Sequence, residues 1–161
     1  MRNRIYLDCD GVLADFDMGF KQEFEIDPSV YETAHGSAAF WKNIRNCNGF
    51  FEHLPLMPDA KELFHAVEHL RPIILTGCPF GGWAENQKMR WRDKHFPGVP
   101  MVTCMSKNKY QYCKTGDVLI DDMEKARAAW NAAGGHFILH TSASNSIGQF
   151  EEINDTYSLN W

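Results

Sequence analysis

The sequence lacks several features that would place it in a familiar class. None of its apolar runs approaches the roughly 20 residues of a membrane-spanning helix, and residues 1–4 lead directly into a strand-like segment instead of the apolar core of a secretion signal. Neither Gly-x-Gly-x-x-Gly nor Gly-x-x-x-x-Gly-Lys occurs, which argues against a dinucleotide-binding dehydrogenase and a P-loop NTPase. We therefore expect a cytoplasmic protein with no membrane partner.

The cysteines show no pattern of a metal site or a disulfide framework. Their number, five, is odd, and no two form a Cys-x-x-Cys pair. A cysteine-based phosphatase needs an arginine six residues after its nucleophile, but Ala84 follows Cys78 at that spacing and Leu119 follows Cys113. The thiols are therefore expected to be reduced and mostly buried.

The overall composition is that of an ordinary globular domain. Of the 161 residues, 44% are hydrophobic and 23% are charged, enough apolar surface for one domain with a real core. The net charge of −5 argues against a surface that follows the phosphates of a long nucleic acid. A bound metal and a few lysines can still attract a small anion, because they set the local field.

Strand-like and helix-like segments alternate through most of the chain. Five buried strands are expected at residues 4–10, 72–77, 99–104, 117–122 and 136–140. Amphipathic helices are expected between them at 58–70, 83–95 and 123–133, and the polar last twenty residues allow one short helix. This alternation predicts an α/β fold with a doubly wound, parallel, five-stranded sheet. Pro100 favours an edge position for the third strand.

Residues 14–57 depart from this alternation, because they are rich in phenylalanine and polar residues and carry no strong strand signal. Phe16, Phe20 and Phe24 recur at helical spacing, Asp27-Pro28 is expected to break that helix, and a second helical piece is expected around 38–41. The stretch is predicted to form a small helical cap inserted after the first strand. Residues 1–13 and 58–161 would form the core domain.

Polar side chains stand where three of the predicted strands end. Asp8 and Asp10 share one face of the first strand, because strand side chains alternate, and Gly11 allows a sharp turn after them. Thr76 ends the second strand, and residues 121–122 end the fourth with two more carboxylates. Ligands of doubly wound sheets bind beyond these strand ends. Since close carboxylates need a cation or a shared proton, the pattern indicates a divalent metal site suited to phosphoryl transfer.

Structural explanations exist for each of these residues taken alone. Asp8 and Asp10 could belong to an acidic turn, and Thr76 could be an ordinary strand end. Asp121 could cap a helix, with Glu124 completing a capping box. The coincidence of three such strand ends at one sheet edge favours the functional interpretation.

Several motifs of the chain resemble those of the haloacid dehalogenase superfamily of phosphohydrolases. They are Asp8-Cys9-Asp10-Gly11-Val12, Leu75-Thr76-Gly77, a lysine, and Leu119-Ile120-Asp121-Asp122. Within that superfamily, the segment at 8–16 and the run Gly49-Phe50-Phe51 followed by Leu54-Pro55 resemble the 5′(3′)-deoxyribonucleotidases. The resemblance covers most of residues 4–125.

The resemblance implies a role for each matching residue. Asp8 would be the nucleophile that forms an aspartyl-phosphate, and Asp10 would protonate the leaving group and later deprotonate water. Thr76 and the amide of Gly77 would bind phosphoryl oxygens. Mg²⁺ would be held by Asp8, the main-chain carbonyl of Asp10, and two further carboxylates, with the second nearby or reached through water: Asp121 and Asp122.

The resemblance also implies a lysine that neutralises the phosphoryl oxygens, and two regions compete for it. Lys88 lies on the helix after the second strand, where the deoxyribonucleotidases carry this residue, and is preferred. Many other relatives carry it just before the fourth strand, where Lys107, Lys109 and Lys114 stand. Lys109 is kept as a candidate substrate-binding residue.

These observations favour a Mg²⁺-dependent phosphomonoesterase for a small nucleotide, preferably a deoxynucleoside monophosphate. Phe16 and Trp41 of the aromatic-rich insertion are candidates to stack on its base. A phosphatase for a sugar phosphate or another small metabolite is one alternative. A non-enzymatic phospho-acceptor module of receiver type is another. A homodimer is left open.

Overall fold

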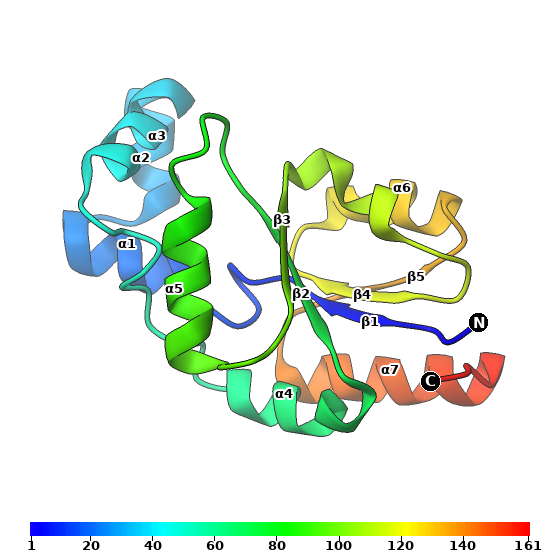
Figure 1. Ribbon diagram of the computed structural model, residues 1–161. Coiled ribbons are helices and arrows are strands. Elements are labelled where there is room, and N and C mark those ends of the chain that lie inside the picture. Colours follow the sequence, from blue (N-terminus) through cyan, green and yellow to red (C-terminus); the bar gives the residue numbers. More distant parts are fainter.

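Five parallel strands form one sheet in the computed structural model, which describes residues 1–161 (Figure 1). Their order is β3-β2-β1-β4-β5, and every neighbouring pair is parallel. The chain starts in the centre, adds two strands on one side and then two on the other, which confirms the predicted doubly wound sheet with its third strand at an edge. The strands are β1 (Ile5–Leu7), β2 (Ile73–Gly77), β3 (Met101–Cys104), β4 (Val118–Asp121) and β5 (His136–Leu139).

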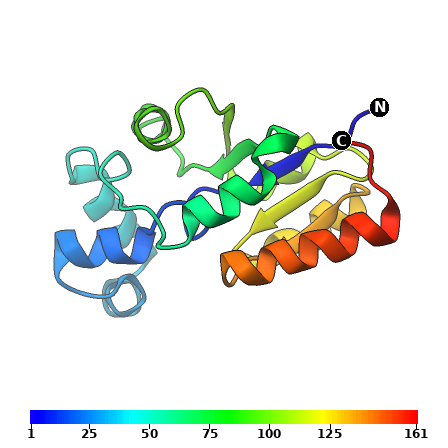
Figure 2. The ribbon, with the colours of Figure 1, turned by 90° about the horizontal axis from the view of Figure 1, so that it is seen from below.

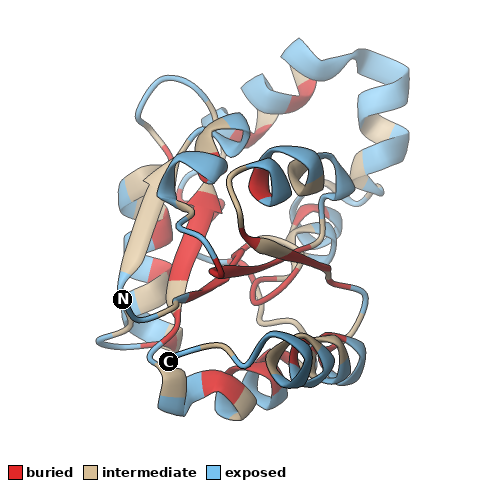
Figure 3. Cartoon of the chain, turned by 90° about the vertical axis from the view of Figure 1, so that its right-hand side faces the viewer, coloured by how far each residue is buried: buried red, intermediate tan, exposed pale blue.

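Strand side chains alternate between two apolar cores, one on each face of the sheet. Ile5 and Leu7 belong to a core of 25 buried residues, whereas Tyr6 between them belongs to a smaller core with Trp130. Buried residues concentrate in the inner strands of the sheet (Figure 3): every residue of β1 and β4 is buried, whereas those of the edge strand β3 are only partly buried. The larger core is covered by α4 (Ala60–Val67), α5 (Glu85–His95) and α7 (Ala143–Tyr157), and the smaller by α6 (Arg127–Ala132).

The connections between these elements contain three short 3₁₀ helices. They are η1 (Glu68–Leu70), η2 (Ser106–Tyr112) and η3 (Glu124–Ala126). The helix predicted at 123–133 is therefore divided into η3 and α6. In Figure 2, α4 and α7 run side by side under the sheet, as their contacts require.

Three helices fill the insertion after β1: α1 (Phe16–Phe24), α2 (Pro28–His35) and α3 (Ser37–Asn46). They lie beyond the C-terminal end of β1, at one end of the molecule (Figure 1). Asp15 starts α1, since its Oδ1 accepts a hydrogen bond from the Met18 amide at 3.0 Å. Phe20 and Phe40 bury their rings between these helices, with centroids 5.1 Å apart.

Two helices differ from the sequence prediction. Asp27-Pro28 was expected only to break a helix, but Pro28 occupies the start of α2, where proline has no amide to satisfy. The polar C-terminal stretch was expected to hold a short helix, but α7 has 15 residues. Its few apolar residues share one face, and Ala143 and Phe150 are buried there. No helix of the protein combines the length and the apolar character that crossing a membrane requires.

Candidate active site

A cavity of about 1330 Å³ opens between the C-terminal edge of the sheet and the insertion. Asp8 and Asp121 line it from the sheet, Lys109 from η2, and Phe16 and Trp41 from the insertion. One wall therefore carries charge and the opposite wall carries aromatic rings. The volume exceeds what a phosphate ion alone needs, so the cavity has room for a phosphorylated small molecule.

The turn after β1 brings Asp8 and Asp10 to this cavity. The β1 ladder ends at Leu7, earlier than the predicted residue 10, and the chain then curls so that the amides of residues 12–14 all donate to the Cys9 carbonyl at 2.8–3.2 Å. Gly11 has φ +82°, and a Cβ there would lie 2.0 Å from Asp122 Oδ2. Glycine is thus required both by the turn and by the close approach of Asp122.

Lys109 binds the first of these carboxylates. Its Nζ donates to Asp8 Oδ1 at 2.7 Å and to Asp121 Oδ2 at 2.8 Å, and all three side chains are buried. Burial alone would lower the pKa of Lys109, but the charges of Asp8 and Asp121 raise it above its usual value. Lys109 therefore stays charged and bridges β1 and β4.

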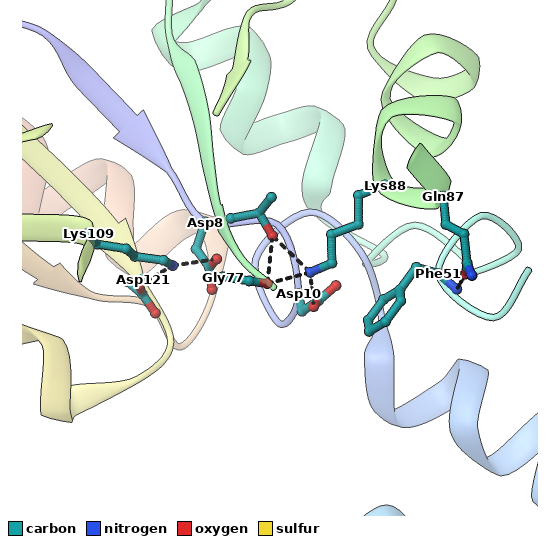
Figure 4. A network of polar contacts seen from close by, with 9 residues as sticks. Asp8, Asp10, Phe51, Gly77, Gln87, Lys88, Lys109 and Asp121 are labelled. Atoms are coloured by element: carbon teal, nitrogen blue, oxygen red, sulfur yellow. Dashed lines mark hydrogen bonds and ion pairs between the residues drawn. The ribbon is translucent and has the colours of Figure 1, made fainter. Parts of the chain in front are cut away.

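Lys88 binds the second carboxylate in the same manner (Figure 4). Its Nζ donates to Asp10 Oδ2 at 2.7 Å, to Thr76 Oγ1 at 2.9 Å and to the Gly77 carbonyl at 2.8 Å. Burial would lower the pKa of Lys88, but the Asp10 carboxylate outweighs it and raises the pKa. Asp10 Oδ1 is buried without a hydrogen-bond partner, although the Asp10 side chain as a whole is 27% exposed.

Three carboxylates form a group that can hold a metal ion. Oxygen atoms of Asp8, Asp121 and Asp122 lie within 4.8 Å of one another. With all three ionised and Lys109 beside them, a net charge of −2 remains, and Asp122 Oδ1 is buried without a partner. These hard oxygen donors fit a divalent cation such as Mg²⁺. The Asp10 carboxylate faces Lys88 and is outside this group.

The same crowding perturbs the protonation of two carboxyl groups. Burial, followed by the charge of Asp8 and a hydrogen bond to it, raises the pKa of Asp122 to about 8. Burial and Asp8 raise the pKa of Asp121 to about 6, although Lys109 opposes the shift. Without a cation, the site therefore favours a proton on Asp122. Asp121 does not cap a helix: its Oδ1 accepts from the Met123 amide at 2.9 Å, and η3 starts at Glu124.

The aromatic wall is built from the insertion. The Phe16 ring lies 5.4 Å from that of Phe50 and 6.3 Å from that of Phe51, measured between centroids. Trp41 remains 37% exposed and packs edge-on against Phe40, so part of its ring faces the cavity. A flat apolar group can therefore be received on this side.

The insertion and the charged wall also touch each other. Lys88 Nζ lies 4.5 Å from the centroid of the Phe51 ring, a cation–π contact, and the Phe51 amide donates to Gln87 Oε1 at 3.0 Å. Phe51 was not among the residues predicted to bind the substrate. Its Gly-Phe-Phe context was a signal, but its contact with α5 depends on how the insertion folds back.

The sequence-predicted residues gather around this one cavity. Asp8, Asp10, Gly77, Lys109, Asp121 and Asp122 line it together with Phe16 and Trp41. Thr76 and Lys88 are buried directly behind them. Both candidate lysines lie at this site, Lys88 on Asp10 and Lys109 on Asp8.

Comparisons with known proteins agree with this arrangement. Residues 2–157 match the model of the family described as 5′ nucleotidase, deoxy (Pyrimidine), cytosolic type C protein. No curated protein sequence matches the chain. A hydrolase from Streptococcus pneumoniae has a similar fold, with a TM-score of 0.54 and 18% identity over 96% of this chain and 100% of its own.

Two further solved structures share the fold. A candidate haloacid dehalogenase-like hydrolase from Burkholderia xenovorans has a TM-score of 0.58 and 15% identity, covering 99% of this chain and 100% of its own. A HAD family hydrolase from Deinococcus radiodurans, solved with bound phosphate and sodium, has a TM-score of 0.53 and 14% identity, covering 84% and 79%. At such identities these structures support the fold alone.

The match to the family model spans nearly the whole chain. It favours an enzyme over a receiver-type phospho-acceptor module. The protein has the fold of the haloacid dehalogenase-like hydrolases, belongs to this family of deoxy 5′-nucleotidases, and is a phosphoric monoester hydrolase.

Proposed function

We propose that the protein is a Mg²⁺-dependent 5′-nucleotidase for deoxynucleoside monophosphates that works through an aspartyl-phosphate on Asp8. One observation carries the proposal: Asp8 and Asp10, separated by a single residue, are each bound by their own buried lysine beside one cavity. Such an arrangement holds one carboxylate for attack and another for proton transfer. The family match supports a phosphomonoester as the substrate.

Asp8 acts as the nucleophile in this proposal. One of its carboxylate oxygens attacks phosphorus, and the bond between phosphorus and the nucleoside oxygen breaks. Lys109, at 2.7 Å from Asp8 Oδ1, fixes the carboxylate in one orientation before the substrate arrives. Water then attacks the phosphorus of the aspartyl-phosphate, which releases inorganic phosphate and restores Asp8.

Asp10 acts as the general acid and base. It donates a proton to the leaving nucleoside oxygen and takes a proton from the attacking water in the second step. Asp10 lines the cavity and its side chain is 27% exposed, so the leaving group can reach its carboxyl group. In the free protein Lys88 donates a hydrogen bond to Asp10 Oδ2 at 2.7 Å. A phosphoryl dianion beside Thr76 competes for this hydrogen bond and frees the Asp10 oxygen.

The remaining polar groups serve the phosphoryl oxygens. Thr76, the Gly77 amide and Lys88 lie together next to Asp10, where donors can bind developing negative charge. Asp8, Asp121 and Asp122, with the main-chain carbonyl of Asp10, would hold Mg²⁺. When bound, the ion supplies Lewis-acid stabilisation of charge on the phosphoryl oxygens.

The insertion selects the substrate in this proposal. Residues 14–57 form a cap domain over the core of residues 1–13 and 58–161, and its Phe16 and Trp41 stack on a nucleobase. The family's description as deoxy, pyrimidine and cytosolic supports a deoxynucleotide substrate and a cytoplasmic location.

The test is phosphate release from a panel of compounds, measured with Mg²⁺ and with EDTA. The panel contains nucleoside 5′- and 3′-monophosphates in ribo and deoxy forms, sugar phosphates and an aryl phosphate. Mg²⁺-dependent release that favours deoxynucleotides is the expected result. Release only from sugar phosphates or the aryl phosphate would contradict the nucleotide assignment, while the proposed roles of Asp8 as nucleophile and Asp10 as general acid and base would stand. Undiminished phosphate release in EDTA would contradict the proposed dependence on Mg²⁺.

A further inference from the structure

Gly77 leaves a space that a side chain from another segment fills. A Cβ added at Gly77 would lie 1.9 Å from the Ser106 Oγ and 3.0 Å from the Ser106 Cβ. Any side chain at position 77 would therefore collide with Ser106. The Ser106 hydroxyl lies against the main chain of Gly77, at the point where β2 ends beside the phosphoryl-binding groups.

The Ser106 hydroxyl is free to bind a ligand. Ser106 lines the same cavity as Asp8, Asp10 and Gly77, and the residue is exposed. No group of the protein hydrogen-bonds its hydroxyl, whereas the nearby Thr76 hydroxyl already accepts from Lys88. If Ser106 only filled the space beside Gly77, its hydroxyl would make no hydrogen bond at all.

The geometry of η2 aims Ser106 and Lys109 in one direction. Side chains three residues apart eclipse each other along a 3₁₀ helix, because it has three residues per turn. Ser106 and Lys109 have this spacing in η2, and Lys109 Nζ already lies 2.7 Å from Asp8 Oδ1. The short helix therefore presents an ammonium and a hydroxyl side by side next to the Asp8 carboxylate.

We propose that Ser106 is a phosphate-binding residue, whose hydroxyl donates to a phosphoryl oxygen of the bound substrate beside the Gly77 amide. The inference rests on the proposed function, because it assigns a ligand contact within the same site. Gly77 and Ser106 then act together: the glycine has no side chain to offer, and Ser106, the first residue of η2, supplies the hydroxyl.

The first test measures binding of inorganic phosphate by calorimetry in the presence of Mg²⁺, without turnover. Ser106→Ala is expected to weaken phosphate binding about 10-fold or more, the effect of losing one hydrogen bond to a charged group. Ser106→Thr keeps a hydroxyl and is expected to recover most of the affinity. Ser144→Ala, a matched change at an exposed serine of α7 away from the cavity, should leave the affinity unchanged.

The second test compares KM values for a deoxynucleotide and an aryl phosphate. Both should rise by the same factor in Ser106→Ala, because the two substrates share only the phosphoryl group. Unchanged phosphate affinity in Ser106→Ala would overturn the inference and leave Ser106 as packing beside Gly77. A rise for the nucleotide alone would also overturn it. Because phosphate binding is measured without catalysis, failure of the nucleotidase assignment would appear separately, as absent release from every nucleotide by the unaltered protein.

Discussion

The two walls of the cavity are built in opposite ways. At the sheet edge, Asp8, Lys88 and Lys109 are at most 5% exposed. Lys109 donates to Asp8 at 2.7 Å, and Lys88 donates to Asp10 and Thr76 at 2.7 and 2.9 Å. On the insertion, Trp41 is 37% exposed and contacts its neighbours only through ring packing. The first wall fixes a set of charges, and the second offers a surface that adapts to a ligand.

This difference follows from the cost of burying charge. A buried carboxylate or ammonium is stable only beside a partner, so each charged residue at the sheet edge depends on another. Aromatic rings gain from burial whatever their neighbours, and stacking tolerates small shifts. Changes at the sheet edge should therefore affect catalysis and stability together. Changes on the aromatic wall should affect substrate binding alone.

Removing the nucleophile should have the largest effect. Asp8→Asn keeps the size of the side chain but withdraws the attacking charge, so we expect kcat to fall about 1,000-fold or more. Phosphate release from the preferred nucleotide measures it. Asp17→Asn removes an exposed carboxylate from the insertion side of the cavity and serves as the matched control, with activity close to the unaltered protein. Retained turnover in Asp8→Asn would remove Asp8 as the nucleophile.

The two buried lysines should respond differently to Mg²⁺. In EDTA, Lys109→Met leaves Asp8 and Asp121 without their cation, and Lys88→Met leaves Asp10 without one. Each loss of a buried partner should lower the free energy of unfolding by about 3 kcal/mol. Added Mg²⁺ should restore much of the stability of Lys109→Met, because an ion that binds the folded state stabilises it.

Lys88→Met should gain no more stability from Mg²⁺ than the unaltered protein does, since Lys109 still binds Asp8 and Asp121 and the Asp10 carboxylate is outside the group of three carboxylates. Thermal unfolding of both variants with Mg²⁺ and with EDTA makes the comparison. Lys125→Met, which removes an exposed cation that lines the cavity and has no ion pair, is the control. Equal recovery of both lysine variants would contradict the assignment of the metal to Asp8, Asp121 and Asp122.

The sheet and its charged edge were accessible from the sequence, and the physical reason is local. Alternating apolar runs fix strands, and strand periodicity was enough to predict Asp8 and Asp10 at one edge of the sheet, although β1 ends at Leu7 and the following turn brings both to the cavity. The parallel topology then brings Thr76 and Asp121 to the same edge. No property of the fold beyond β-α alternation is needed for that conclusion.

The contacts of the lysines were not accessible, because they join elements far apart in the chain. Lys109 reaches Asp8 across 101 residues, and Lys88 reaches Asp10 across 78. Sequence spacing indicated one phosphate-neutralising lysine and treated the positions as rivals. Similarly, α7 has so few apolar residues that only its packing against α4 and β5 shows why it is long.

The exposed part of the aromatic wall should give a smaller effect, confined to nucleotides. Trp41→Ala removes a stacking surface worth about 1–3 kcal/mol per base, so KM for a deoxynucleotide should rise about 10-fold. KM for an aryl phosphate that is too short to reach the insertion should stay unchanged, and so should the melting temperature. Met18→Ala, an exposed apolar residue of α1 outside the cavity, is the control. An equal rise of KM for both substrates would mean that Trp41 acts on the phosphoryl group, which the two substrates share, and not on the nucleobase.

The smallest effect should come from histidines that belong to neither wall. Burial lowers the pKa of His95, helped by Lys94 and Lys61, and burial lowers the pKa of His136. The folded state then binds protons less readily than the unfolded chain. As the pH falls from 7.5 through 6.5, the unfolded chain takes up protons first, so the free energy of unfolding should decrease and then level off below the folded pKa values.

Urea unfolding across this pH range measures the effect. In a variant with both His95→Gln and His136→Gln, the free energy of unfolding should change less steeply with pH. The same flattening should occur in the Asp8→Asn background, since these histidines act on stability from outside the cavity. If the double replacement left the slope unchanged, the acid sensitivity would have to arise at other groups, either at His140, whose pKa burial also lowers, or at the charged sheet edge.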